Sequence, residues 1–211
     1  KYILRNSRVR DCYIGVNGGK DIINNMIYAN SSYGIIGYTD FAQNNIVMWN
    51  GDFGIVATEA DGNIVMFNKY GIRCLIARNN IVRCNSWKGI DTSSNCVIEG
   101  NVISDTGWYG GIYGETIDGV IRNNVITRCY RGIVFTYGNP IIHNNVIASC
   151  GRGMVSNSGW PEIRNCIFWD NGDDLVYSPW DIKYCLTGES YPGEGNISCD
   201  PKFVGWGEFD L

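Results

Sequence analysis

The middle of the chain carries four side chains whose chemistry is complementary. Asp91 follows Arg73 by 18 residues, Tyr113 follows Asp91 by 22, and Glu115 comes two residues after Tyr113. A cation beside carboxylates can polarise a bound substrate and exchange protons with it, and a phenol can donate a proton. We take Arg73, Asp91, Tyr113 and Glu115 as candidate catalytic residues, although no sequence motif assigns a role to any one of them.

Four aromatic side chains lie in the same stretch: Trp87, Trp108, Tyr109 and Tyr130. The apolar faces of sugar rings stack on aromatic faces, while sugar hydroxyls bond to charged and polar groups. Aromatics beside carboxylates therefore predict a carbohydrate-binding groove, with these four residues as its binding side chains. The alternative is that the aromatics cover the end of a sheet.

A repeat of about 20 residues must position these side chains. The segments 78–82, 122–126 and 143–147 have nearly the same sequence. Anchors defined on this pattern recur every 17 to 23 residues, at Ser7, Asn25, Asn45, Asn63, Asn80, Asn101, Asn124, Asn145 and Asn165. A second anchor, a glycine followed by an aliphatic residue, comes eight to ten residues after each of the first eight, from Gly15 to Gly153. Two registers that keep step along the chain indicate a repeat architecture.

Three short strands with their turns account for about 20 residues, so the repeat predicts a β-solenoid whose adjacent coils pair as parallel strands. We expect an all-β fold of about nine coils. A leucine-rich repeat has a similar period, but it requires a leucine pattern and a helical half that this sequence lacks. In a solenoid, equivalent residues of successive coils stack in columns about 4.8 Å apart.

The column two residues after each glycine carries most of the candidate catalytic groups. Strand alternation points this column to solvent, and it reads Asn17, Ile36, Val56, Arg73, Asp91, Tyr113, Val134 and Val155. Three candidates therefore lie on consecutive coils, and with Glu115 they form a patch about 10 Å across. Because the patch lies outside the core, we expect Asp91→Asn and Trp108→Ala to weaken glycan handling without changing the melting temperature.

Other columns predict structural roles. Paired asparagines just before and at the first anchor favour an asparagine ladder at a turn. Cys12, Cys129 and Cys150 share a column with Cys84 beside it, and we expect all four thiols to be buried and reduced. That column also holds Asp170, at the turn where the repeat begins to degenerate. We expect catalysis by a thiol to be absent, because His143 is the only imidazole available as its base.

A further column, two residues before the first anchor, runs from Arg5 to His143 and alternates in charge sign over several coils. It predicts a surface ion-pair ladder. Cys185 and Cys199 lie outside the repeat and are the best candidates for a disulfide.

Composition excludes several classes of function. The 211 residues carry a net charge of −4 with no block of Lys or Arg, so we predict no nucleic-acid partner. No apolar run is long enough for a membrane span. One histidine and no Cys-x-x-Cys disfavour zinc. We predict no cofactor, with calcium at the acidic turns 59–63 and 170–174 left as an open alternative, since neither turn matches an EF-hand loop.

Repeats such as Ile-Arg-Asn-Asn-Val-Ile and Gly-Ile-Val resemble the right-handed parallel β-helix repeat shared by pectate-lyase-like polysaccharide enzymes, phage tailspikes and surface proteins. The resemblance covers residues 1–176 and implies a right-handed solenoid. Residues 195–204 resemble the segment that ends many secreted β-helix proteins, which implies an irregular C-terminal cap over residues 177–211. Members that cleave polyuronates use an Arg or Lys base with acidic calcium ligands, whereas hydrolases use clustered aspartates, and neither signature is complete here.

We therefore predict a secreted or cell-surface protein that acts on or binds extracellular polysaccharide, as a lyase or glycoside hydrolase would. The alternative is a non-catalytic structural or adhesive module for surface assembly. A metal-handling solenoid is disfavoured by the single histidine and four methionines. The chain begins inside a coil, so we expect it to be part of a longer chain or of an end-to-end assembly.

Overall fold

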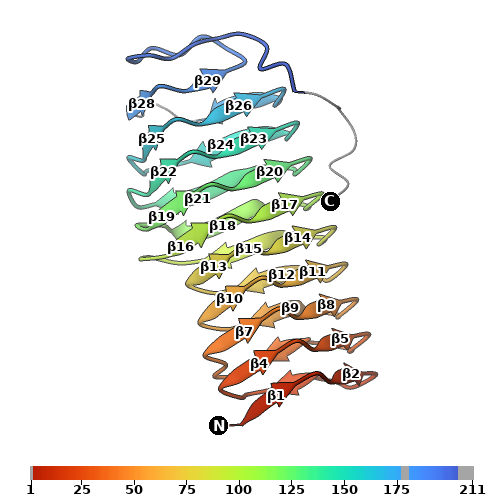
Figure 1. Ribbon diagram of the computed structural model, residues 1–211. Helices are drawn as coiled ribbons and strands as arrows, with labels where there is room; N and C mark the ends of the chain where they lie inside the picture. Colours follow the sequence, from red (N-terminus) through yellow and green to blue (C-terminus); the bar gives the residue numbers. More distant parts are fainter. Residues whose placement is uncertain (1, 177–180, 204–211) are drawn as a thin grey trace.

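The computed structural model describes residues 2–176 and 181–203, and within them the regular secondary structure consists of strands alone. Three parallel sheets run along one axis, and the chain visits them in the same order in every coil (Figure 1). Sheets of ten, ten and nine strands give nine complete coils and part of a tenth. The predicted all-β solenoid of about nine coils is confirmed.

Sheet A comprises β1 (Ile3–Arg5), β4 (Asp21–Ile23), β7 (Phe41–Gln43), β10 (Glu59–Asp61), β13 (Ile76–Arg78), β16 (Val97–Glu99), β19 (Val120–Arg122), β22 (Ile141–His143), β25 (Glu162–Arg164) and β28 (Asp181–Lys183). Sheet B comprises β2 (Arg8–Arg10), β5 (Met26–Tyr28), β8 (Ile46–Met48), β11 (Ile64–Met66), β14 (Ile81–Arg83), β17 (Val102–Ser104), β20 (Val125–Thr127), β23 (Val146–Ala148), β26 (Ile167–Trp169) and β29 (Leu186–Thr187). Sheet C comprises β3 (Val16–Asn17), β6 (Ile35–Ile36), β9 (Phe53–Val56), β12 (Tyr70–Arg73), β15 (Lys88–Thr92), β18 (Gly110–Thr116), β21 (Ile133–Tyr137), β24 (Arg152–Ser156) and β27 (Asp173–Val176).

The core is a set of stacked aliphatic columns. In the three-residue strands of sheets A and B, the middle residue points inward, as Ile98 does in β16 and Ile103 in β17. In sheet C, Ile72, Ile90 and Ile112 occupy one fully buried column. Because each coil contributes about one such side chain per sheet, the hydrophobic core runs the length of the solenoid.

The turn between sheets A and B, here called the ladder turn, is always two residues long. Its second residue forms the predicted asparagine ladder: the Asn80 amide donates to Asn101 Oδ1 at 2.9 Å, and the Asn101 amide to Asn124 Oδ1 at 3.0 Å. Its first residue has a positive φ, for example 53° at Asn79, a conformation that asparagine and glycine tolerate best.

The ladder changes residue type near its end, which corrects one anchor. Asn145 donates to Cys166 Sγ, so Cys166 holds the ladder position, and Asn165 is the positive-φ residue before it. The predicted anchor at Asn165 is therefore wrong by one residue, because a cysteine replaces the asparagine in that coil. The same shift removes Asp170 from its predicted column, where Asn171 instead accepts from the Cys150 N–H at 2.9 Å.

The recurrence of a glycine in sheet C from coil to coil has a steric cause. A Cβ added at Gly89 would lie 2.4 Å from the Gly111 carbonyl oxygen and 2.9 Å from Ile103 Cγ2. At Gly71 it would lie 2.3 Å from the Gly89 oxygen. Only a residue without a side chain lets the backbone enter sheet C this close to the neighbouring coil and the core.

The cysteine predictions are confirmed in part. Cys129 and Cys150 are buried thiols as expected, whereas Cys12 is exposed and Cys84 is half-buried. Cys12 shares the column of Cys129 and Cys150 but lies in the first coil, and Cys84 is the positive-φ residue of its turn, one position before that column. The predicted disulfide between Cys185 and Cys199 is absent: both are free, with Cys185 buried and Cys199 exposed. Cys185 instead packs under Cys166 and accepts a hydrogen bond from its backbone N–H.

The solenoid continues beyond residue 176. Strands β28 and β29 add to sheets A and B, because the buried side chains of Ile182 and Thr187 continue the inward columns of Ile163 and Phe168. The irregular segment predicted from residue 177 is thus confined, among the described residues, to 188–203. Within the described residues, no helix is long and apolar enough to cross a membrane.

Candidate functional site

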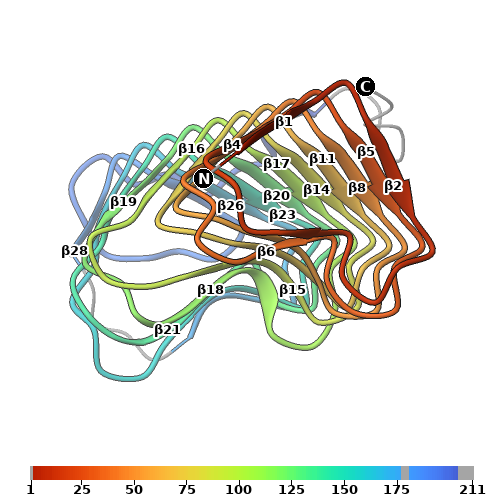
Figure 2. The ribbon, with the colours of Figure 1, turned by 90° about the horizontal axis from the view of Figure 1, so that it is seen from below.

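The connection from sheet C to sheet A, here called the variable turn, differs in length from coil to coil. Five residues take the chain from Gly54 to Glu59 and from Gly71 to Ile76, but eight are needed from Gly89 to Val97 and nine from Gly111 to Val120. Figure 2, which views the solenoid from below, shows the coils of β18 and β21 reaching beyond the early coils at this corner. The two short coils therefore leave a recess between longer ones.

This recess, here called the notch, has a volume of about 830 Å³. Its floor is formed by Val56 at the end of β9 with the two residues after it, Ala57 and Thr58, and by Arg73 at the end of β12 with Cys74 and Leu75 after it. The loop 37–40 borders it on one side, and the extended strands β15 and β18 form the wall on the other. A drug-sized ligand site typically has a volume of this order.

All four predicted catalytic residues line the notch. The register places Arg73 beside Asp91 and Asp91 beside Tyr113 on neighbouring strands, so the predicted adjacency is confirmed. Glu115 lies further along β18 and is exposed. Their catalytic roles remain a prediction.

Asp91 is the centre of the charged lining. Its Oδ2 accepts from Arg73 Nε at 2.8 Å and Arg73 Nη2 at 2.7 Å, and its Oδ1 lies 3.0 Å from Lys88 Nζ. Only 9% of its side chain is exposed. The expectation that Asp91 points freely to solvent is therefore wrong, because a long cationic side chain from each side covers the carboxylate.

Lys88 was not predicted and is the least exposed cation of the site, with 13% of its side chain accessible. Besides Asp91, its ammonium lies 3.9 Å from the centre of the Tyr113 ring and 5.1 Å from that of Tyr109. Such cation–π contacts stabilise a partly desolvated charge. Burial, followed by the charge of Asp91, raises the pKa of Tyr113 above its usual value, so its phenol stays protonated at neutral pH.

The loop 37–40 adds two further side chains that sequence reasoning missed. Tyr38 lies at the notch border and is 90% exposed. Thr39 is 2% exposed, and its hydroxyl has no hydrogen-bond partner among the described residues. The signal that could have revealed both was the length of the variable turn, which is seven residues from Gly34 to Phe41 and only five in the next two coils.

The four predicted carbohydrate-binding aromatics lie outside the notch lining. Trp87 stacks on Tyr109 with ring centroids 5.7 Å apart, and Tyr109 meets Tyr113 edge-on at 5.2 Å. This row continues through Tyr70 and Phe53, whose rings stack at 4.5 Å. Because the rings in this row pack against one another, they offer little open surface on which a sugar could stack.

Trp108 and Tyr130 form a separate exposed pair with ring centroids 5.7 Å apart. They lie on the turn that precedes sheet C. Their assignment as carbohydrate-binding residues, like that of Trp87 and Tyr109, remains a prediction. Tyr38, which faces the notch and has no stacked partner among the described residues, is the better placed ring for a ligand there.

The thiol that lines the notch, Cys74, is fully enclosed. Burial, followed by the nearby Cys96, raises the pKa of Cys74 well above its usual range. A thiol that keeps its proton is a poor nucleophile. Cys74 is therefore not an activated cysteine.

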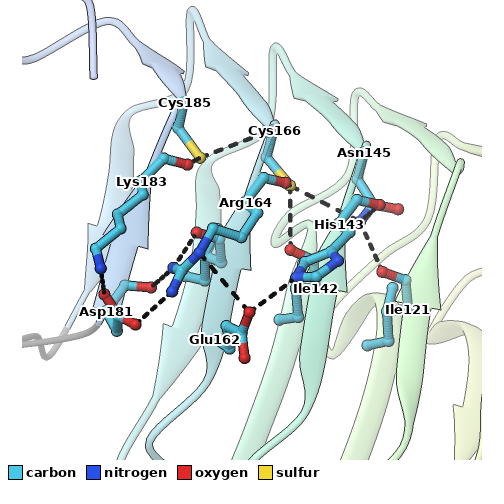
Figure 3. A network of polar contacts seen from close by, with 11 residues as sticks. Ile121, Ile142, His143, Asn145, Glu162, Arg164, Cys166, Asp181, Lys183 and Cys185 are labelled. Atoms are coloured by element: carbon cyan, nitrogen blue, oxygen red, sulfur yellow. Dashed lines mark hydrogen bonds and ion pairs between the residues drawn. The ribbon is translucent and has the colours of Figure 1, made fainter. Parts of the chain in front are cut away.

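The charged column on sheet A carries a second polar network, and Figure 3 shows its part around His143 and Arg164. His143 Nε2 lies 3.4 Å from Glu162, Arg164 Nε lies 3.7 Å from the same carboxylate, and Arg164 Nη2 pairs with Asp181. Earlier in the column, Arg122 pairs with Glu99 at 2.9 Å. The predicted ladder of surface ion pairs is confirmed in part: within the column Arg122 pairs with Glu99, whereas Arg78 pairs with Glu59 from outside it. The exposure of these side chains makes each pair a small contributor to stability.

Metal binding has no obvious site in the described residues. No group of three or more His, Cys, Asp or Glu side chains there could hold a metal ion. At the second acidic turn, both oxygens of Asp174 already accept hydrogen bonds, from the Asn171 amide at 2.8 Å and the Gly188 N–H at 2.7 Å. That carboxylate serves to fix the turn.

Comparison with known proteins identifies the repeat. The model of the family described as right-handed β-helix region matches residues 38–181. No curated protein and no solved structure matches the chain. The matched range includes every residue that lines the notch except Gly37.

Proposed function

The chain belongs to the right-handed β-helix family, and from this premise and the notch we propose that it binds a segment of an extracellular polysaccharide. The proposal includes a location outside the cell or on its surface, where such polymers occur. The observation that carries it is the notch itself: a recess of about 830 Å³, lined by charged, hydroxyl and tyrosine side chains, on the surface of a rigid solenoid.

The lining offers partners for both the apolar faces and the hydroxyl groups of a sugar chain. Tyr38 offers an open ring for the apolar face of a pyranose, and Thr58, Ser93 and Ser94 offer hydroxyls for its polar rim. Glu115 and the outer N–H groups of Arg73 can bond to vicinal hydroxyls. The notch extends over the coils of β6 to β18, a distance of about 19 Å at the usual strand spacing.

The polar contacts favour binding over cleavage. Both oxygens of Asp91 accept from cations, and the ammonium of Lys88 is committed to Asp91 and Tyr113. Acid–base catalysis by two carboxylates needs both to reach the scissile bond. Glu115 is the one candidate carboxylate without an ion pair in the described part of the chain. This observation supports the non-catalytic alternative among the functions predicted from sequence.

The proposal is tested by calorimetric titration of the protein with a panel of neutral and uronic polysaccharides. We expect at least one to bind, and Tyr38→Ala to weaken that binding at least tenfold because one stacking surface and its pocket are lost. Tyr13→Ala is the matched control, since Tyr13 is another exposed tyrosine, outside the notch lining.

The same mixtures are assayed for reducing ends and for the absorbance of unsaturated products. Product release that is abolished by Glu115→Gln would show that the notch is an active site rather than a binding site. Absence of binding to every polysaccharide, or equal loss in the Tyr13 and Tyr38 variants, would contradict the proposal.

A further inference from the structure

The charges of the notch decide which class of polysaccharide it can hold. Two cations line it, Arg73 and Lys88, against three carboxylates, Asp40, Asp91 and Glu115. The sum over the lining is therefore −1, in a protein whose overall net charge is −4. A polymer with a carboxylate on each sugar would enter a recess of its own charge sign.

The two cations are also held by a carboxylate of the protein itself. Arg73 directs two of its N–H groups to Asp91, and its guanidinium carbon lies 4.3 Å from the centre of the Phe53 ring. Lys88 directs its ammonium to the other Asp91 oxygen and to the face of Tyr113. A uronate that displaced Asp91 from either cation would leave that largely buried charge unpaired. At the outer N–H groups of Arg73 it would meet a guanidinium whose charge Asp91 already balances.

Bridging by a divalent cation would be the other way to admit a uronate. Such bridging needs several carboxylates gathered at one point. Asp91 is occupied by Arg73 and Lys88, and Glu115 lies on a different strand near the rim. The described residues contain no group of three acidic, His or Cys side chains placed to hold an ion.

We infer that the notch selects uncharged glycans and excludes polyuronates, with Asp91 acting as a built-in counter-ion that takes the place of a substrate carboxylate. This inference rests on the proposed function, because it specifies the class of ligand for the same site. Sugar hydroxyls can donate to Glu115, which ionised carboxylates cannot do, and they can accept from the remaining N–H groups of Arg73 without disturbing the Asp91 pairs.

The test uses polymers that differ in charge alone. A neutral glucan is compared with the same glucan oxidised at C6 to the uronate, alongside neutral xylan and galactan and acidic polygalacturonate and alginate, each with and without added calcium. We expect the tightest ligand to be neutral, with its affinity changing less than about twofold between low and high salt, because no counter-ions are released. We expect uronates to bind at least tenfold more weakly.

A charge-reversal variant tests whether the charge of the lining determines which polymer binds. Glu115→Lys changes the charge of the lining from −1 to +1 at an exposed position, so folding should be preserved. We expect uronate affinity to rise at least tenfold in this variant and to fall steeply with salt. Asp91→Asn, which releases both cations, should act in the same direction, and Glu99→Lys on sheet A is the control for a general change of charge.

The outcomes separate the two proposals. A polyuronate that binds the unmodified protein more tightly than every neutral polymer overturns the inference and leaves the proposed function standing. Uronate binding that stays unchanged in Glu115→Lys also overturns it, since charge would not be the discriminating feature. If no polymer of either class binds, the proposed function itself fails.

Discussion

The ladder turn and the variable turn lie at two corners of the same coils, yet they follow opposite rules. The ladder turn keeps two residues in every coil, and buried asparagines at its second position bond from Asn25 to Asn145. The variable turn ranges from five residues after Gly54 to nine after Gly111, counted to the next strand of sheet A. One corner holds the coils in register, which leaves the other free to change length and create the notch.

This contrast predicts at which positions a substitution lowers the stability of the fold. At the ladder turn, each amide bonds both neighbouring coils, so damage at one position leaves polar groups unsatisfied in two places. At the variable turn, side chains face the notch and solvent, so they can change with little effect on folding. Exceptions are Thr39 and Cys74 in the turn itself and Asp91 in β15, which line the notch yet are buried.

The largest effect should follow from removal of a central ladder residue. Asn80 accepts from the backbone N–H and the amide of Asn63, both at 2.9 Å, and donates to the Ala60 carbonyl and to Asn101. Asn80→Ala deprives these buried groups of partners and should lower the free energy of unfolding by about 3 kcal/mol. Chemical denaturation followed by far-UV circular dichroism measures the change.

The control is the preceding residue of the same turn. Asn79 is exposed and has a φ of 53°, which glycine also adopts, so Asn79→Gly should change stability by less than about 1 kcal/mol. Comparable losses of unfolding free energy in the two variants would contradict the conclusion that only the second residue of the ladder turn holds the coils together.

The next largest effect should come from Asp91→Asn. Loss of its charge leaves Lys88 largely buried without a counter-ion, while Arg73, half of whose side chain is exposed, can turn to water. We expect a loss of about 2 kcal/mol, below that of a fully buried pair because of this exposure. This replaces the sequence-based expectation of an unchanged melting temperature. Thermal denaturation measures it, with Glu99→Gln, from an exposed pair with Arg122, as the control that should cost less than about 1 kcal/mol.

Asp91 also shows how far sequence reasoning reaches. The repeat anchors placed Arg73, Asp91 and Tyr113 side by side correctly, because parallel coils turn sequence alignment into spatial adjacency. Strand alternation also gave the side of the sheet correctly. It could not show that Lys88, from the position just before the glycine, bends over Asp91, because the path of a long side chain depends on its neighbours in three dimensions.

The origin of the notch and the end of the repeat escaped prediction for different reasons. A groove beside the four candidate residues was predicted, but its origin in a difference in length between coils was not, because the anchors were taken as one repeat of about 20 residues. At the end of the repeat, Cys166 takes the ladder position, and the asparagine one residue earlier attracted the anchor. A cysteine can replace the asparagine because its thiol also donates to a backbone carbonyl, here that of Arg164 at 3.3 Å.

A smaller effect is expected at the third corner, between sheets B and C. Burial there acts to raise the pKa of Asp105, but two hydrogen bonds from Arg128, at 2.8 and 3.0 Å, help to lower it overall below its usual value. A lowered pKa in the folded state stabilises the protein above the unfolded pKa of about 4, and this contribution disappears as the pH falls through the folded value.

The variant Asp105→Asn tests the direction of this pH dependence of stability. Asparagine accepts the φ of 54° at this position, so the variant removes charge with little strain. We expect it to be less stable by under about 1 kcal/mol at pH 7, since the pair is largely exposed, and the difference from the unmodified protein to shrink towards pH 3. Denaturation midpoints at the two pH values give the comparison, and a gap that widens in acid would contradict it.

The smallest effect on stability, and the clearest on function, is expected at Thr39 in the variable turn. Its hydroxyl is buried without a partner, so Thr39→Val keeps the shape and removes an unsatisfied group. The free energy of unfolding should therefore stay within about 0.5 kcal/mol of the original or rise slightly.

If a sugar hydroxyl completes this hydrogen bond in the notch, glycan affinity should fall about fivefold, the equivalent of one ordinary hydrogen bond. Thr136→Val, at a half-buried position outside the notch lining, is the control and should leave the affinity unchanged. A Thr39 variant that binds as tightly as the original would show that ligands do not reach this wall, and one that unfolds easily would show that the hydroxyl holds the loop 37–40 in place.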